Sequence, residues 1–172
     1  MPDNSLTQFA AYVEMLCAKH VDIHHTPEEP HFIELNDEKQ LAAGKNQVYP
    51  LVALDKLTIS YSGANDGMLK SRVCDILFLD KAPVGDYVEV QLIKNKMEII
   101  AEEFVVKMKQ DSRDRAKYPY LRNLVVGSIE INHVDNEGIN LHGALLSFSY
   151  ELPFSETITE GRFDENVSFP MS

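Results

Sequence analysis

Residues 86–109 read DYVEVQLIKNKMEIIAEEFVVKMK, and this is the stretch that decides the fold. Its apolar residues recur at three- and four-residue spacing, at Ile93, Met97, Ile100, Ala101, Phe104 and Met108. This period places them on one stripe of an α-helix. Asp86 followed by Glu89 is a capping pattern for the start of such a helix. The stretch therefore predicts the main helix, with its apolar stripe lying across a β-sheet.

Several segments before this helix have the composition of β-strands. They cover residues 31–35, 49–54, 57–61 and 72–79. The last of them is apolar on both faces over residues 76–79, which is typical of a strand at the centre of a sheet. Residues 62–69 are rich in glycine, asparagine and aspartate, so they predict a hairpin connection between the last two strands.

Two longer strands are predicted after the helix, over residues 124–134 and 140–152, with a hairpin turn between them. In the second strand Leu146, Phe148 and Tyr150 face one way, and the serines between them face the other. This alternation is typical of an antiparallel strand with one buried face. Near the N-terminus, apolar residues at helical spacing predict an amphipathic helix that ends near Lys19.

Together these elements predict a single α+β domain over residues 1–153. We expect an antiparallel or mixed sheet of about five strands, packed by one long helix and accompanied by the N-terminal helix. Residues 154–172 lack periodicity but keep Phe154 and Phe163 among acidic and hydroxyl side chains, so they predict an extended tail or arm. This segment is either loosely packed or disordered, or it docks on a neighbouring subunit.

The charge balance is strongly acidic, with 27 Asp and Glu against 16 Lys and Arg and a net charge of −11. Because nucleic-acid binding depends on Lys and Arg neutralising phosphates, this composition argues against sequence-specific nucleic acid as a partner. The acidic excess has two interpretations. It keeps the protein soluble through self-repulsion, or it forms a surface that nucleic acid passes without sticking.

Cys17 and Cys74 are the only cysteines, they form no C-x-x-C pair, and both stand at apolar-facing positions. They are therefore predicted to be reduced core thiols, which favours a reducing, cytoplasmic compartment. The sequence contains neither a signal-peptide pattern nor an apolar run of about 18 residues, so we expect no membrane partner.

One cluster has the side chains of a metal site: His20, Asp22, His24, His25 and His31. In an extended segment, residues two apart share a face, so His20, Asp22 and His24 would present three ligands to zinc or a similar ion. The alternative is a solvated polar loop. Motifs for nucleophilic catalysis and for phosphate or cofactor binding do not occur, so we predict no catalytic residue, no cofactor and no enzymatic activity.

The one basic group is Arg113, Arg115 and Lys117, within a segment of residues 110–120 that is predicted to be an exposed loop. Tyr118 and Tyr120 stand beside it. Basic and aromatic side chains together are typical of contacts with nucleic acid. A flexible surface loop and a contact with an acidic neighbouring protein are the alternatives.

In its order of elements, the chain resembles phage head-tail joining and tail-terminator-like (minor tail) subunits of Bacteroidetes phages and prophages. The segments that carry the resemblance are Phe9 to Leu16, His31-Phe32 with Leu35, Tyr49-Pro50-Leu51-Val52 with Leu54, Met97 to Met108, and Gly143 to Pro153. It covers residues 5–153 as a pattern of elements, through short motifs. The His20 to His31 stretch and the tail depart from it.

The resemblance implies a non-enzymatic structural subunit that forms a ring, often hexameric, with copies of itself in a tail or neck. Other tail or neck proteins would be its partners, and the assembled particle its destination. Subunit contacts would then involve the 62–69 hairpin, Arg113, Arg115 and Lys117 in the loop, and Phe154 and Phe163 in the tail. Two alternatives remain: a metal-binding module or metal-dependent enzyme built on His20 to His31, and a monomeric host-interaction or regulatory binding module.

Overall fold

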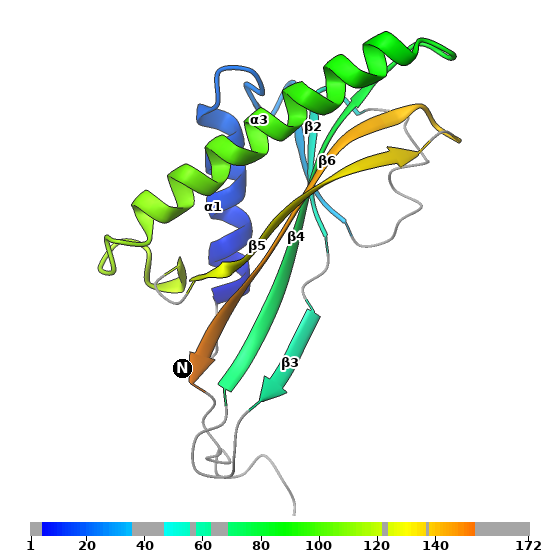
Figure 1. The fold of residues 1–172 in the computed structure, drawn as a ribbon. Helices are drawn as coiled ribbons and strands as arrows, with labels where there is room; N and C mark the ends of the chain where they lie inside the picture. The colour runs from blue at the N-terminus through cyan, green and yellow to red at the C-terminus, as the bar shows by residue number, and fades with distance from the viewer. Residues whose placement is uncertain are drawn as a thin grey trace, which may run out of the picture.

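A computed structural model describes residues 5–35, 47–55, 58–62, 69–121, 124–136 and 138–153 of the chain. Figure 1 shows two long helices on a twisted sheet. The elements are α1 (Ser5–Lys19), β1 (Phe32–Glu34), β2 (Leu51–Leu54), β3 (Thr58–Ser62), β4 (Leu69–Lys81), α3 (Tyr87–Asp111), the short 3-10 helix η1 (Pro119–Leu121), β5 (Leu124–Asn136) and β6 (Leu141–Pro153).

The described strands form one mixed six-stranded sheet in the order β1-β2-β4-β6-β5, with β3 also paired to β4. β1 and β2 are parallel, and the other neighbouring strands are antiparallel. The predicted fold class is therefore confirmed: an α+β protein whose sheet is packed by one long helix, with a second helix at the N-terminus.

β2 and β3 lie end to end along the same edge of β4, which explains why six strands occupy five positions across the sheet. Leu54 at the end of β2 pairs with Ile76, and Thr58 at the start of β3 pairs with Val73. The predicted hairpin is flanked by the antiparallel pair of Ser62 with Leu69. Its connecting residues, 63–68, lie outside the described part of the chain.

The main helix begins where the capping pattern predicts. The Asp86 side chain accepts a hydrogen bond from the backbone N–H of Glu89 at 3.0 Å, which satisfies one of the unpaired donors of the first turn. The six apolar residues of the predicted stripe are all buried. The helix continues two residues beyond the predicted end, to Asp111, which is itself buried.

Both helices pack on the same face of the sheet. Phe104 of α3 lies edge-on to Phe78 of β4, with ring centroids 5.0 Å apart. Phe9 of α1 lies edge-on to Phe148 of β6, with centroids 5.8 Å apart. Phe78 and Phe148 belong to the same face because Phe148 pairs with Cys74, which lies an even number of residues from Phe78 along β4.

The two cysteines are free and fully buried, as predicted. Cys17 lies on α1 and Cys74 on β4, within the same apolar cluster. Burial raises the pKa of both thiols well above the usual range. Each thiol therefore stays protonated and behaves as a small apolar side chain.

Gly143 of β6 pairs with Leu79 of β4. A Cβ atom built at Gly143 would overlap the carbonyl oxygen of Phe78. The obstacle is backbone in the centre of the sheet, so it cannot move aside as a flexible side chain would. Only glycine fits this position without displacing a strand.

We predict that Gly143→Ala lowers the free energy of unfolding by about 1–3 kcal/mol, the usual cost of overpacking. Chemical denaturation followed by circular dichroism measures this change. Gly127→Ala is the matched control, since a Cβ at Gly127 meets nothing within 4 Å. Equal stability of the two variants would contradict the proposed overlap.

Candidate functional site

The histidines between α1 and β1 connect structural elements. His20 Nδ1 accepts the backbone N–H of Asp22 at 3.2 Å, and His20 Nε2 lies 2.8 Å from Glu103 on α3. Because a backbone N–H can only donate, the neutral His20 ring carries its proton on Nε2 and donates it to Glu103. His20 thus links the end of α1 to the main helix.

His25 makes the same two kinds of hydrogen bond as His20. Its Nδ1 accepts the backbone N–H of Phe32 at 3.1 Å, and its Nε2 lies 3.3 Å from Glu14 of α1. The neutral ring therefore donates from Nε2 to Glu14. His31 is buried, and its Nδ1 donates to the carbonyl oxygen of Pro50 at 2.7 Å. These contacts fix the path of the chain from α1 into the sheet.

The predicted convergence of His20, Asp22 and His24 does not occur. In the described part of the chain, no group of three or more His, Cys, Asp and Glu side chains is placed to hold a metal ion. The prediction assumed an extended segment, but residues 21–23 form a turn directly after α1, and His24 has a positive φ of 51°. The two-residue spacing therefore does not bring these side chains to one face.

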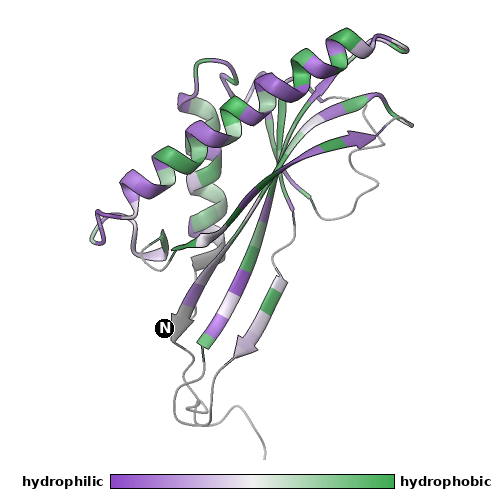
Figure 2. Cartoon of the chain, viewed as in Figure 1, coloured by the Kyte–Doolittle hydropathy of each residue, from purple (hydrophilic) through white to green (hydrophobic). Residues whose placement is uncertain are grey.

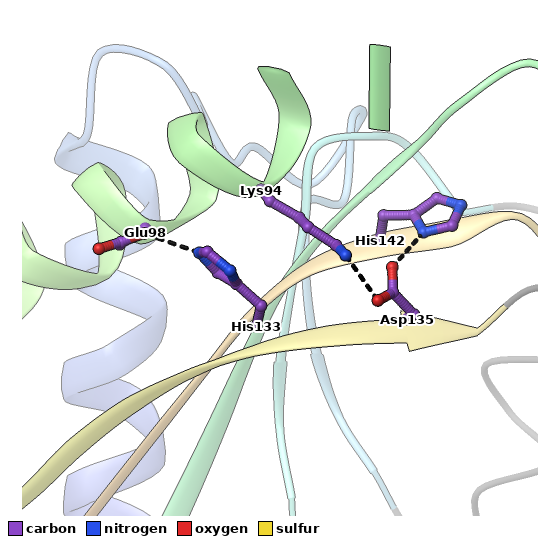
Figure 3. Close-up of polar contacts among 5 residues, drawn as sticks. All are labelled: Lys94, Glu98, His133, Asp135 and His142. Carbon is purple, nitrogen blue, oxygen red and sulfur yellow. Dashed lines mark hydrogen bonds and ion pairs between the residues drawn. The ribbon is translucent and has the colours of Figure 1, made fainter. Parts of the chain in front are cut away.

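A polar network joins α3 to the β5–β6 hairpin on the helix-covered face of the sheet (Figure 3). Lys94 Nζ lies 2.6 Å from Asp135 Oδ2, and His142 Nδ1 lies 2.8 Å from Asp135 Oδ1. One helical turn further along, His133 Nε2 lies 2.7 Å from Glu98. Asp135 and His142 are cross-strand partners, so the ladder itself brings them together.

This network combines a carboxylate, an amine and an imidazole, but its geometry is that of a structural contact. We call the Lys94–Asp135–His142 contact the clamp, because it holds α3 to the β5–β6 hairpin. Both oxygens of Asp135 are occupied, and Lys94 and His142 are largely buried beneath them. Hydrogen bonds from Lys94 and then from His142 lower the pKa of Asp135. The network therefore favours an ionised carboxylate that holds α3 against the hairpin.

We predict that Lys94→Met raises the pKa of Asp135 toward its ordinary value. In the native protein this pKa is lower in the folded than in the unfolded state, so ionised Asp135 stabilises the fold above the unfolded-state value. That contribution is lost as the pH falls through the folded-state pKa. The variant should therefore show a weaker loss of stability on acidification. Carboxyl NMR titration and acid unfolding measure both effects, with Lys96→Met as the control.

The segment after α3 is anchored at both of its ends, which corrects the prediction of a wholly exposed loop. Asp111 is buried, accepts a hydrogen bond from the Tyr12 hydroxyl at 2.9 Å and pairs with Lys107 at 2.6 Å. Tyr118 is also buried, edge-on to Tyr12 with ring centroids 5.4 Å apart. Burial and the nearby Asp111 carboxylate raise the pKa of Tyr12 above its usual range, so it remains a hydrogen-bond donor.

Between these anchors, Arg113, Arg115 and Lys117 are exposed, as the sequence predicted for this basic group. Lys117 lies over the ring of Tyr118, with Nζ 5.2 Å from the centroid. Of the three cations, Lys117 lines a shallow groove between this segment and α1, which includes Tyr12, Met15, Pro119 and Tyr120. Phe154 and Phe163, the other predicted contact residues, lie outside the described residues.

We predict that Tyr12→Phe lowers the free energy of unfolding by about 1–3 kcal/mol, because the buried Asp111 carboxylate loses its neutral donor. Thermal or urea unfolding measures the change. Tyr87→Phe is the control, since Tyr87 is 81% exposed. A loss no larger than that of the control would mean that the Tyr12 hydroxyl contributes nothing to the fold.

β3 and the ends of β4 and β6 that pair beside it extend past the helices as a wing (Figure 1). Figure 2 shows mostly hydrophilic colouring along β4 in this region. All five residues of β3 are exposed, including Ile59 at 47% and Tyr61 at 52%. Among the described strands, β3 pairs only with β4.

The sheet face opposite the helices carries a small apolar cavity of about 190 Å³. It lies at the β5–β6 end and is lined by Leu77, Leu79, Val134, Asp135, Asn136, Ile139 and Leu141. Its lining is mostly aliphatic and contains no histidine, cysteine or lysine. The cavity therefore lacks a nucleophile and base in reach of each other.

Comparison with protein-family models finds no match, and comparison with curated proteins finds none with significant similarity. In the described part of the chain, no helix is both long and apolar enough to cross a membrane. Sequence reasoning identified the histidines and the basic group but missed the Lys94–Asp135–His142 and Tyr12–Asp111 contacts, which join distant segments.

Proposed function

We propose that the protein is a non-enzymatic structural subunit of a phage-derived tail or neck assembly, in which copies of the chain join into a ring. The observation that carries this proposal is that β3, exposed along all five residues, pairs on one side only among the described strands. An exposed strand edge presents unpaired backbone N–H and C=O groups to other chains. A strand from a neighbouring copy would extend the sheet by main-chain hydrogen bonds.

The sequence of β3 supports this role. Natural proteins protect exposed edges with charged residues or proline. The five residues Thr-Ile-Ser-Tyr-Ser at 58–62 contain neither. On a monomer, an unprotected edge on the wing would promote aggregation. On a subunit, the same edge pairs with a neighbouring copy and is covered on assembly.

A ring requires a contact between two different surfaces of neighbouring copies. If β3 pairs with a different surface of the next copy, the contact is heterologous, and successive copies form a closed ring when their rotations add up to a full turn. A net charge of −11 per subunit then makes an acidic ring, which repels nucleic acid and lets it pass without sticking. Other tail or neck proteins would bind the faces of this ring, and assembly would begin in the cytoplasm.

The test is the solution mass of the purified protein by light scattering at several concentrations, with metal content measured on the same sample. We predict a closed oligomer that Ile59→Lys reduces to smaller species, because a charge on an edge strand disfavours pairing. Val84→Lys is the matched control, since Val84 is 84% exposed in a turn away from β3.

A native protein that stays monomeric at every concentration would contradict self-assembly. If that monomer also carried stoichiometric zinc, the metal-binding alternative would take its place. An oligomer that Ile59→Lys leaves unchanged would mean that subunits join elsewhere than at β3.

A further inference from the structure

The outer face of α3 carries a line of exposed apolar side chains, which we name the outer stripe: Val88, Leu92, Ile99 and Val106. Their exposed fractions are 73%, 56%, 56% and 54%. At 3.6 residues per turn, all four lie within about 20° of Ile99 around the helix axis. They therefore face away from the buried stripe that packs on the sheet, whose centre lies about 150° around the helix axis.

Single exposed apolar residues are ordinary on protein surfaces. The outer stripe differs because Leu92, Ile99 and Val106 recur at intervals of seven, so an apolar side chain returns to nearly the same side of the helix every two turns. A shallow hollow of about 440 Å³ lies beside its C-terminal half, formed by Ile99, Glu102, Glu103, Val106, Lys107 and Gln110. Such a hollow receives side chains from a second helix.

We infer that the outer stripe binds the same stripe of a second copy, with the two α3 helices antiparallel about a two-fold axis near Ile99. In this arrangement Ile99 of each copy meets Ile99 of the other. Leu92 of each copy meets Val106 of the other. The contact is self-complementary, as a two-fold interface requires.

The charges beside the stripe select this partner and this direction. Along one flank, Glu89, Lys96 and Glu103 alternate in sign at intervals of seven. In the antiparallel pair, Lys96 of each copy lies opposite Glu103 of the other, which forms two ion pairs. A parallel pair would instead bring Glu103 of each copy beside Glu102 of the other, and like charges repel.

The stripe is also left accessible by the other contacts of α3. Glu98 and Lys94 hold one flank of the helix to the β5–β6 hairpin, and Glu103 receives His20 on the other flank. These contacts fix the rotation of α3 about its axis, so the outer stripe always faces outward.

The size of the surface sets the strength of the contact. Residues 88–106 span about 27 Å of helix at 1.5 Å per residue. One helix pair of this length lies at or below the lower end of the roughly 1,200–2,000 Å² that stable interfaces bury. We therefore expect a weak dimer that forms as concentration rises. This pairing does not depend on β3 or on the proposed ring.

Cysteine cross-linking tests the pairing and its register. Cys17 and Cys74 are the only native cysteines and both are buried, so an introduced cysteine supplies the accessible thiol. Under mild oxidation Ile99→Cys should give a disulfide-linked dimer. Leu92→Cys alone and Val106→Cys alone should not, because like positions lie about 21 Å apart along the antiparallel pair. A mixture of these two variants should cross-link to each other.

Val126→Cys is the control for random collision, since Val126 is 54% exposed on β5. In the native protein, Ile99→Glu should abolish concentration-dependent dimers in sedimentation velocity while the melting temperature stays unchanged. Absence of the Ile99→Cys cross-link above the Val126→Cys level overturns the inference. Equal cross-linking by Leu92→Cys alone also overturns it. Retention of the Ile99→Cys cross-link on an Ile59→Lys background would separate this contact from the ring.

Discussion

β4 and β6 pair antiparallel along thirteen residues each, from Leu69 with Pro153 to Lys81 with Leu141. Every other element takes its position from this ladder. β2 and β3 share the outer edge of β4, β5 pairs on the outer edge of β6, and both helices pack across the centre. Because the ladder is longer than the helices can cover, one end of it leaves the core and forms the wing.

The ladder also explains the clamp between α3 and the β5–β6 hairpin. Antiparallel register puts Asp135 opposite His142, and Lys94 reaches the same carboxylate from the helix above. On the other flank of α3, His20 reaches Glu103 from the end of α1. Polar contacts thus hold both sides of a helix whose inner face is apolar, which leaves its outer face available for other molecules.

Much of this fold could be predicted from the sequence because local periodicity determines it. The three- and four-residue spacing of apolar residues in 86–109 predicted the ends of the main helix to within two residues. The ends of the last two strands were predicted with the same accuracy. The segments at 49–54 and 57–61 are two separate strands, as predicted, but their end-to-end pairing along one edge of β4 leaves no trace in a local pattern. β4 also proved longer than predicted, because its wing end has no apolar face.

The candidate site was harder to predict, for a physical reason. His20, Asp22 and His24 have the right side chains for a metal, but the turn after α1 and the positive φ of His24 do not bring them together as ligands. Tyr12 and Asp111 are separated by 99 positions, and no spacing rule joins them. Contacts of this kind arise from the way the helices and the sheet pack, which the order of residues does not display.

The long ladder has a mechanical consequence. Hydrogen bonds between antiparallel strands run perpendicular to the strands. A force applied along β4 at one end and along β6 at the other loads all of these bonds together in shear, whereas a force across the sheet would open them one pair at a time. The strands run from the wing, past the helices, to the β5–β6 hairpin. A force that pulls these two ends apart therefore acts along the direction in which the molecule resists extension most strongly.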